Sequence, residues 1–546
     1  MREFDTPDSL TSGVCRPGQN EIWFRVRMAF WDECHGVCTG VTNATPDTEL
    51  QPEWANPDNP GGQKRELLLA TSSAVSDNVM AITGRHELGH VLGFAHEHER
   101  FDLADPGCTP KWGWRTLTPP DDLSIMGYDS CDGIANNQPR LSPYDRLGAF
   151  YQYTWARRHA LMMGGGSSIE NLAYDSSGRA GIAWHRPWDH EIELWTSAGS
   201  PGEPLEFHAS HHCLSGNQGA CKGDVVEHAR QRPSPLFASG MAADLDVLML
   251  GPGVGIDDVI QNNKNGIFQP QPIAIDGYAI PVIGSFEHDI DDELLLYRPG
   301  PEEDTLVVFD ADGGISSLPL GYSDYAIPLV GRFRGFGGGG NDIIWYQPHH
   351  NTLHVWQWQN FESFEFWENG PDDAKSIGLS PLTEYIPILG DFNGDTFTDM
   401  FWYAPGRVTD WLWESASTQE AILFSVFPHD VDGEYRPFVG DFDGDDIHDI
   451  LWYAVADEVD GVNSVIWYFD DKGGHDVRIF TIHGDYTPII GDFDDDGCSD
   501  VLWYEPTAED GSSPLWRCLP GERDFACDPP VIHPSQGYPI GNGGAY

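Results

Sequence analysis

The sequence from residue 170 to residue 546 repeats one pattern of hydrophobic and polar positions. The complete pattern has an apolar run that begins Tyr-x-Pro and ends in Gly, then an acidic turn, then a second apolar run that ends in Trp-Tyr. Three copies are plain, with paired apolar runs at residues 385–390 and 400–403, 435–440 and 450–453, and 486–491 and 501–504. Short apolar runs bounded by Gly, Asn and Asp predict β-strands joined by tight turns.

Weaker copies of the pattern bring the total to seven. They lie around Gly240, Gly284 and Gly331, and a further one runs from residue 174 to residue 184. A period of about 45 to 60 residues with four strands in each unit is typical of a β-propeller. The sequence therefore predicts an all-β propeller of seven blades over residues 170–546. The Trp-Tyr pairs are expected in the blade cores, and the alternative is that they stack against a ligand.

The two ends of the repeat region complement each other. The first copy lacks the Tyr-x-Pro run, whereas residues 538–541 read Tyr-Pro-Ile-Gly with no copy after them. We expect this last run to supply the missing strand of the first blade, because such a pairing removes an open sheet edge.

Residues 1–160 follow another pattern and predict a separate α+β domain. Strand-like runs occur at residues 21–30 and 66–71, and Ser76 or Asp77 can cap a helix that follows. A second helix is predicted from Pro143 to about residue 153, since Ser142 can cap it and proline is favoured at the first helical position. Residues 161–169 are rich in Gly and Ser and predict a linker between the two domains.

The first predicted helix carries a candidate metal site. His86 and His90 are four residues apart, so both side chains project from one helix face. Gly93 can end the helix, which lets His96 approach the same ion from another direction. Three imidazoles leave one position of a zinc ion open for water, and Glu87 is placed to accept a proton from it. The predicted chemistry is amide hydrolysis; the alternative is an ordinary helix with solvated polar residues.

Residues 86–97 read His-Glu-Leu-Gly-His-Val-Leu-Gly-Phe-Ala-His-Glu, and residues 124–128 read Ser-Ile-Met-Gly-Tyr. Together they resemble the metzincin zinc endopeptidases, and among these the astacin-like and serralysin-like branches. The resemblance implies one catalytic zinc with these assignments: His86, His90 and His96 as ligands, Glu87 as general base and acid, Met126 as the hydrophobic floor below the ligands, and Tyr128 as the hydroxyl that binds the oxyanion.

Two further positions bear on this resemblance. In astacins the glutamate after the third histidine meets the mature N-terminus, and Glu97 matches that position. Gly127 replaces the histidine that these families usually have in the Met-turn. The alternative for Tyr128 is a packed aromatic side chain in a turn, although a hydroxyl beside a zinc-bound oxyanion is a reasonable stabiliser.

The acidic turns of the three plain copies follow D-x-[DN]-x-D-x-x-x-D. This spacing places oxygen ligands at alternate positions of a tight turn and completes the shell with a later aspartate, as a calcium site requires. We expect about three structural calcium ions. The alternative is that Asp, Asn and Gly serve only as turn formers. The predicted ligands are Asp391, Asn393, Asp395 and Asp399; Asp441, Asp443, Asp445 and Asp449; and Asp492, Asp494, Asp496 and Asp500. The repeats resemble the FG-GAP or VCBS type found in integrin-like propellers and some secreted lectins.

Composition narrows the possible partners. The chain has 546 residues, of which 86 are acidic and 30 basic, so its formal net charge is −56. Such a charge argues against binding to nucleic acid or to an anionic membrane surface. No run of eighteen apolar residues occurs, so no membrane span is expected.

The cysteines predict an oxidising compartment. Ten are present without a C-x-x-C zinc motif, and several are close in sequence, so we expect disulfides. Proximity in sequence predicts these pairs and leaves Cys15 and Cys498 over: Cys34 with Cys38, Cys108 with Cys131, Cys213 with Cys221, and Cys518 with Cys527. The start of the sequence has no apolar signal run, so the expectation that the protein is exported rests on the cysteines alone.

Two functional hypotheses follow. In the first, the chain is a secreted zinc endopeptidase that cleaves protein or peptide substrates, and its calcium-binding propeller recognises the substrate or an extracellular protein or glycan partner. In the second, it is an adhesin or glycan-binding propeller with an inactive metallopeptidase-like module. The complete set of ligands, base and Met-turn favours the first.

Overall fold

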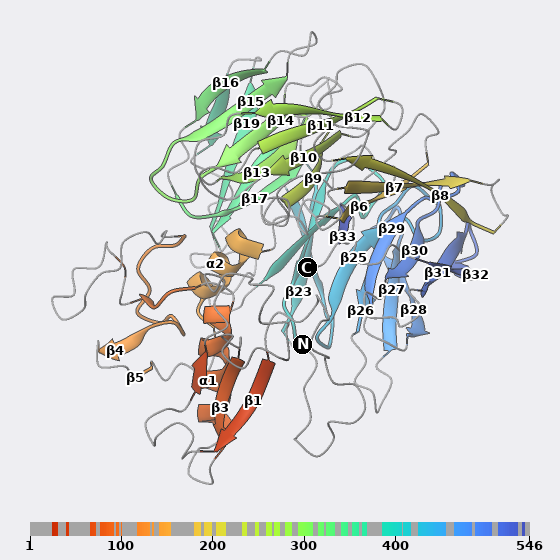
Figure 1. Ribbon diagram of the computed structural model, residues 1–546. Coiled ribbons are helices and arrows are strands. Elements are labelled where there is room, and N and C mark those ends of the chain that lie inside the picture. Colours follow the sequence, from red (N-terminus) through yellow and green to blue (C-terminus); the bar gives the residue numbers. More distant parts are fainter. Residues whose placement is uncertain are drawn as a thin grey trace. The chain divides into compact units, whose positions relative to one another are not determined.

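The structure is a computed structural model. It divides into two compact units, Met1–Ala149 and Phe150–Tyr546 (Figure 1). The predicted linker at residues 161–169 lies outside the residues that the structure describes. These are residues 25–30, 40–42, 66–71, 77–91, 94–97, 100, 117–130, 134–135, 141–153, 179–186, 191–198, 204–213, 232–236, 246–250, 258–264, 267–273, 279–286, 293–309, 315–320, 324–333, 340–347, 352–359, 363–367, 385–406, 408–416, 424–454, 463–482, 486–504, 512–532 and 538–540.

The N-terminal unit has a three-stranded sheet with a helix packed on it. Strand β1 (Arg25–Phe30) runs parallel to β3 (Glu66–Thr71), and β2 (Gly40–Thr42) runs antiparallel to β3 on its other side. Helix α1 (Asp77–Val91) contacts β2 and β3. After it come the short pair β4 (Tyr128–Ser130) and β5 (Ile134–Ala135) and then helix α2 (Pro143–Tyr153), which begins in this unit and extends past its last residue, Ala149.

The start of α2 has the cap that its sequence predicts. The Ser142 Oγ accepts the backbone N–H of Asp145 at 2.9 Å, and Asp145 Oδ2 accepts the backbone N–H of Ser142 at 2.9 Å. This reciprocal pair satisfies two backbone donors that a helix N-terminus leaves without partners. It also holds the Asp145 carboxylate in a fixed place.

The C-terminal unit is a β-propeller, and five consecutive blades have their four strands in chain order, all antiparallel. Each blade is named below by its strands. They are β13 (Ile280–Gly284), β14 (Glu293–Tyr297), β15 (Asp304–Phe309) and β16 (Ile315–Leu320); β17 (Ile327–Gly331), β18 (Asp342–Gln347), β19 (Thr352–Gln359) and β20 (Ser363–Trp367); β21 (Ile386–Gly390), β22 (Asp399–Tyr403), β23 (Asp410–Ser415) and β24 (Phe424–His429); β25 (Arg436–Gly440), β26 (Asp449–Tyr453), β27 (Asn463–Phe469) and β28 (His475–Thr481); and β29 (Thr487–Gly491), β30 (Asp500–Tyr504), β31 (Ser512–Leu519) and β32 (Asp524–Ile532).

Two further four-stranded sheets belong to the same unit. One contains β9 (Arg232–Leu236), β10 (Asp246–Leu250), β11 (Asp258–Lys264) and β12 (Ile267–Ile273). The other has the order β33–β6–β7–β8, with β33 (Tyr538–Ile540), β6 (Gly181–Arg186), β7 (Glu191–Ala198) and β8 (Glu206–Cys213). Strand β33 pairs antiparallel with β6, so the last run of the sequence does supply the strand that the first copy lacks.

Neighbouring blades meet through the Trp-Tyr pairs. The tyrosine at the end of each second strand contacts the tryptophan on the second strand of the following blade, with ring centroids 4.8–5.4 Å apart. Aromatic pairs at this separation contribute about 0.5–1.5 kcal/mol each beyond their buried area. The prediction that these residues form the blade cores is confirmed, because the tryptophans are at most 1% exposed. The contacts are Tyr297–Trp345, Tyr346–Trp402, Tyr403–Trp452, Tyr453–Trp503 and Tyr504–Trp184.

A second kind of joint links the backbones of neighbouring blades. In each blade, one residue directly follows the first strand, and its carbonyl accepts a hydrogen bond from the next blade at 2.7–2.9 Å. The donor is the backbone N–H of the residue that directly precedes the second strand of that next blade. The strand before this joint ends in glycine because the next blade approaches closely: a Cβ on Gly331 would lie 2.8 Å from the Thr398 side chain. The bonds are Asn341 to Ser285, Thr398 to Arg332, His448 to Asp391, Ser499 to Asp441, and Ala180 to Asp492.

Deletion of residues 538–546 tests the role of β33. The deletion removes the antiparallel partner of β6, and it uncovers backbone groups beside Trp184, which is fully buried in the intact chain. We expect the thermal midpoint of the propeller to fall by at least ~5 °C, measured by circular dichroism. The control is deletion of residues 541–546 alone, which keeps β33. Equal midpoints for the two truncations would show that β33 does not stabilise the sheet.

Candidate metal centres

Three histidines come together at the end of α1. One ring nitrogen from each of His86, His90 and His96 lies within 4.8 Å of the other two. The Nε2 atoms of His90 and His96 are 3.0 Å apart, and the ring centroids are separated by 4.5–5.3 Å. The segment after the helix therefore does return His96 to the face that carries the first two histidines.

The backbone orients two of these rings. His86 Nδ1 lies 2.7 Å from the carbonyl of Ile125, and His90 Nδ1 lies 2.8 Å from the carbonyl of Phe94. A carbonyl only accepts, so each Nδ1 carries the hydrogen and each Nε2 keeps its lone pair. This is the arrangement that metal-binding histidines have, with one nitrogen fixed by an outer partner and the other directed to the ion. The donor set thus fits zinc.

The other predicted residues of this site lie on the same segments. Glu87 follows His86 on α1 and is buried. Met126 is buried against the helix, where a Cβ on Gly89 would collide with its Sδ atom. Only a glycine at position 89 leaves room for that methionine. Tyr128 begins β4 two residues later, and its side chain lies outside the described part of the chain.

A carboxylate that the sequence analysis did not single out fixes the Met-turn. Asp145 Oδ2 accepts the N–H of Ile125 at 2.9 Å, and Asp145 Oδ1 accepts the hydroxyl of Ser124 at 2.6 Å. The peptide groups flanking Ile125 thus connect α2 to His86, since the Ile125 carbonyl accepts from His86 Nδ1. The only feature of the sequence that could have indicated this role of Asp145 is its position three residues after the predicted cap Ser142.

Glu97 has local partners in the described residues. Its Oε1 lies 3.2 Å from Arg100 Nη1 and accepts the backbone N–H of Asp121 at 2.9 Å. Burial raises the pKa of Glu97 to about 7, although the nearby Arg100 acts to lower it. The pairing of Glu97 with the N-terminus, which the resemblance implied, stays a prediction because residues 1–24 lie outside the described part of the chain.

The acidic loops of the propeller share one backbone conformation. In the β25–β26 loop, Asp441 Oδ1 accepts the N–H groups of Gly444 and Asp445, and its Oδ2 accepts that of Asp446. The fourth and sixth loop residues have positive φ, for example 72° at Gly444 and 67° at Asp446. The first aspartate therefore forms the turn itself, as the turn-former alternative supposed.

Two of the three predicted loops also bring carboxylates together. One oxygen from each of Asp441, Asp443 and Asp449 lies within 4.8 Å of the others, and the same holds for Asp492, Asp494 and Asp500. All six side chains are buried. Burying several carboxylates side by side is costly unless a cation or protons neutralise them, and an all-oxygen donor set suits calcium. Turn formation alone does not require the second and last aspartates to converge.

The β21–β22 loop differs from the other two. Its Asp391, Asp395 and Asp399 are not all within that distance of one another, and Asn393 occupies the second ligand position. Asp391 still organises the turn, since it accepts the N–H groups of Gly394 at 2.8 Å and Thr396 at 2.7 Å. A cluster of three converging carboxylates is therefore found in two of these three loops, and the third has an amide at the second position.

The last aspartate of each loop has a structural task that the sequence did not reveal. Asp449 Oδ2 accepts the N–H of Phe442, and its Oδ1 accepts the N–H of Phe469, both at 2.9 Å. It therefore ties the loop to the end of the third strand of its own blade. Burial raises the pKa of Asp449 well above its usual value, and the same is true of the equivalent Asp399 and Asp500.

One predicted disulfide is wrong. Cys518 pairs with Cys498, which joins the β29–β30 loop to the end of β31, and Cys527 is a free, exposed thiol. Cys527 was the predicted partner because it lies close to Cys518 in the sequence, and the two residues are on the paired strands β31 and β32. The register instead places Cys527 opposite Trp516, while Cys518 lies opposite Phe525. Cys213 is disulfide-bonded, and the remaining predicted partners lie outside the described residues.

Neither helix in the described part of the chain is long and apolar enough to cross a membrane.

No protein-family model and no curated protein matches the sequence. One similar solved structure is a lectin from Agrocybe aegerita, studied for its recognition of non-reducing terminal N-acetylglucosamine. It is 12% identical to this chain, the match covers 65% of this chain and 90% of that chain, and the TM-score is 0.48. AofleA from Arthrobotrys oligospora is 12% identical, with 58% of this chain and 91% of that chain covered and a TM-score of 0.31. An exotype rhamnogalacturonan lyase is 12% identical, with 56% of this chain and 65% of that chain covered and a TM-score of 0.25. With TM-scores below 0.5, these similarities carry no argument about function.

The raised carboxyl pKa values predict how stability depends on pH. Burial and the neighbouring Asp494 and Asp492 raise the pKa of Asp496 from 3.8 to about 7. Between these two values the folded chain binds more protons than the unfolded chain, so the free energy of unfolding falls as pH rises from about 4 to about 7. Asp496→Asn removes the titrating group, while its amide oxygen can still accept the Cys498 N–H. We therefore expect the free energy of unfolding of this variant, measured by urea titration with a chelator present, to fall less steeply with pH. Parallel pH profiles for the two proteins would contradict the assignment.

Proposed function

We propose that the chain is a secreted zinc-dependent endopeptidase. The observation that carries the proposal is the convergence of three histidine nitrogens, two of them with the other ring nitrogen fixed by a backbone carbonyl. Zinc held in this way supplies a Lewis acid that lowers the pKa of water and polarises a carbonyl. The resemblance of residues 86–97 and 124–128 to the metzincins selects peptide bonds as the substrate class.

The chain's own residues then have separate tasks. Glu87 accepts the proton of the attacking water and passes it to the leaving amine, and Tyr128 donates a hydrogen bond to the developing oxyanion. Met126 supports the base of the site, because it packs against the helix at Gly89. Asp145 holds the turn that orients His86, through the backbone of Ile125.

The propeller is proposed to bind structural calcium through its acidic loops. The buried clusters at Asp441, Asp443 and Asp449 and at Asp492, Asp494 and Asp500 support two ions, and the spacing of Asp391, Asn393, Asp395 and Asp399 supports a third. The sheets β9–β12 and β33–β6–β7–β8 would complete the five blades to a ring of seven. Its proposed role is to hold a substrate or an extracellular protein or glycan partner, and the Cys498–Cys518 disulfide supports secretion.

The peptidase proposal is tested with Glu87→Gln. The variant keeps the shape of the side chain but cannot take up a proton, so we expect zinc content to stay unchanged and casein cleavage to fall by ~10³-fold or more. Zinc is measured by elemental analysis and cleavage by release of labelled peptides. The control is Asp122→Asn, an exposed carboxylate of the same unit, which should retain full activity.

Two outcomes would oppose this proposal in different ways. Undiminished cleavage by Glu87→Gln would refute the role of that residue. A wild-type protein that contains zinc and cleaves no peptide bond would favour the alternative, an adhesin or glycan-binding propeller with an inactive metallopeptidase-like module.

The calcium proposal is tested by thermal unfolding with calcium and with a chelator. A ligand that binds only the folded state raises its stability, so we expect millimolar calcium to raise the midpoint by several degrees. Asp492→Asn should reduce this increase, because Asp492 organises the β29–β30 loop through the N–H groups of Asp495 and Gly497. The matched control is Asp471→Asn, whose side chain is exposed and pairs with Lys472. No increase in the wild-type protein would rule out calcium stabilisation.

A further inference from the structure

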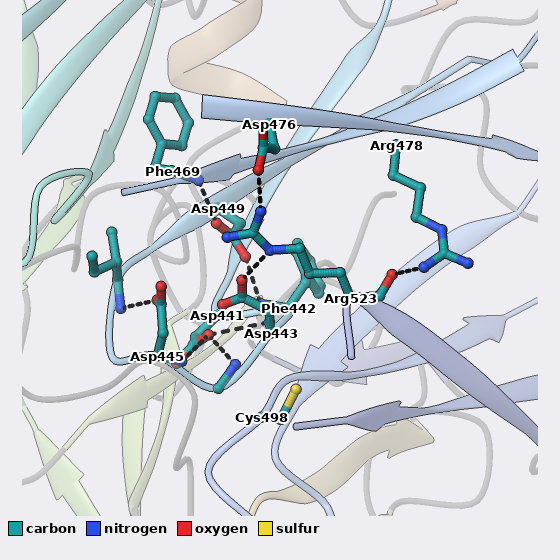
Figure 2. Close-up of polar contacts among 12 residues, drawn as sticks. Asp441, Phe442, Asp443, Asp445, Asp449, Phe469, Asp476, Arg478, Cys498 and Arg523 are labelled. Atoms are coloured by element: carbon teal, nitrogen blue, oxygen red, sulfur yellow. Dashed lines mark hydrogen bonds and ion pairs between the residues drawn. The ribbon is translucent and has the colours of Figure 1, made fainter. Parts of the chain in front are cut away.

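The β31–β32 hairpin covers the acidic loop of the preceding blade. The N–H of Gly521 donates to the Asp443 carbonyl at 2.6 Å. From the same hairpin, Arg523 donates through Nε to Asp443 Oδ2 at 2.7 Å and through Nη1 to Asp476 Oδ2 at 2.5 Å (Figure 2). Its guanidinium also lies over the ring of Tyr468, 5.2 Å from the centroid. A cation from one blade is therefore fixed at the edge of the carboxylate cluster of another.

The two carboxylate oxygens of Asp443 differ in their contacts, and only Oδ2 accepts a hydrogen bond from Arg523. The side chain is 5% exposed, and its Oδ1 atom is buried without a hydrogen-bond partner among the described residues. The same residue belongs to the cluster with Asp441 and Asp449. A buried carboxylate oxygen without a donor is costly, and a metal ion in the cluster would supply its missing partner.

The neighbouring loop provides an internal comparison. In the β21–β22 loop the neutral Asn393 occupies the position of Asp443, and in the hairpin of the following blade Gly474 stands directly before β28, as Arg523 stands before β32. The cation nearest in sequence in that hairpin is Lys472, which is 79% exposed and pairs with Asp471. Between these two loops, the additional carboxylate and the guanidinium are either both present or both missing.

We propose that Arg523 is a resident counter-charge that lowers the calcium affinity of the β25–β26 loop by neutralising Asp443. The inference rests on the calcium binding proposed above and assigns the control of one site to a residue of the next blade. Without calcium, the guanidinium offsets the cost of burying the Asp443 carboxylate. With calcium bound, the same guanidinium repels the ion, so arginine and calcium oppose each other at this loop.

The size of the effect is limited by solvent. Arg523 is 34% exposed and its second partner Asp476 is 82% exposed, so water screens part of the repulsion. We therefore expect a change of about tenfold in the dissociation constant of this site rather than an all-or-none effect.

The experiment is calcium titration of the chelator-treated full chain by calorimetry, for the wild type and for Arg523→Gln. In the variant one class of sites should bind calcium about tenfold more tightly while the others stay unchanged. Without calcium, the thermal midpoint of the variant should be lower than that of the wild type, and saturating calcium should reduce this difference. The matched control is Lys472→Gln, which removes the exposed cation of the corresponding hairpin and should change neither quantity.

A double variant separates counter-charge from simple bracing. Asp443→Asn with Arg523→Gln reproduces the neutral combination of the β21–β22 loop, so its calcium affinity should return to within about threefold of the wild type. Weaker or unchanged binding in Arg523→Gln alone would overturn the inference, because a residue that only positions Asp443 would weaken binding when removed. Absence of any calcium binding by the wild type would instead remove the calcium proposal, and this inference with it.

Discussion

The contact between one blade and the next is the constraint on which the propeller depends. A four-stranded sheet with apolar side chains on both faces is not stable alone, so each blade must be covered by its neighbours. Two contacts recur at each such boundary among β13–β32 and again between the β29–β32 blade and β6: a tyrosine against the next tryptophan, and a backbone carbonyl that accepts from the next blade. Together they fix both the spacing and the register of adjacent sheets.

The acidic loops belong to this joint, which links their chemistry to the fold. The residue whose carbonyl bonds to the next blade is, in the three plain repeats, also the first aspartate of the loop. The last aspartate ties the loop to its own third strand, and in the β25–β26 loop the next hairpin also covers it. Any ion in such a loop would therefore contact groups already fixed by two blades. This explains how carboxylates can be buried there at an acceptable cost.

The histidine cluster of the N-terminal unit depends on a different device. Two of its three rings are held by backbone carbonyls, and one of these carbonyls belongs to a turn that is itself fixed by the Asp145 carboxylate at the start of α2. His86 is thus oriented by residues some forty to sixty positions later in the chain, whereas the partner of His90 is the nearby Phe94. Support of this kind gives a metal site its geometry before an ion arrives.

The sequence by itself determined what depends on local pattern. The repeat period predicted blades and the glycine-ended strands predicted their turns, because side-chain alternation and turn chemistry act over a few residues. Comparison of the repeats predicted the partner of β6, because the first copy lacks a strand that the terminal Tyr-Pro-Ile run can supply. The spacing of His86, His90 and His96 likewise predicted their convergence. Only the tertiary structure decided that Cys498 pairs with Cys518, that Asp145 supports the Met-turn, and that Arg523 reaches Asp443. These contacts join residues 20 to 80 positions apart, and their geometry is set by how strands and blades pack, which no local pattern encodes.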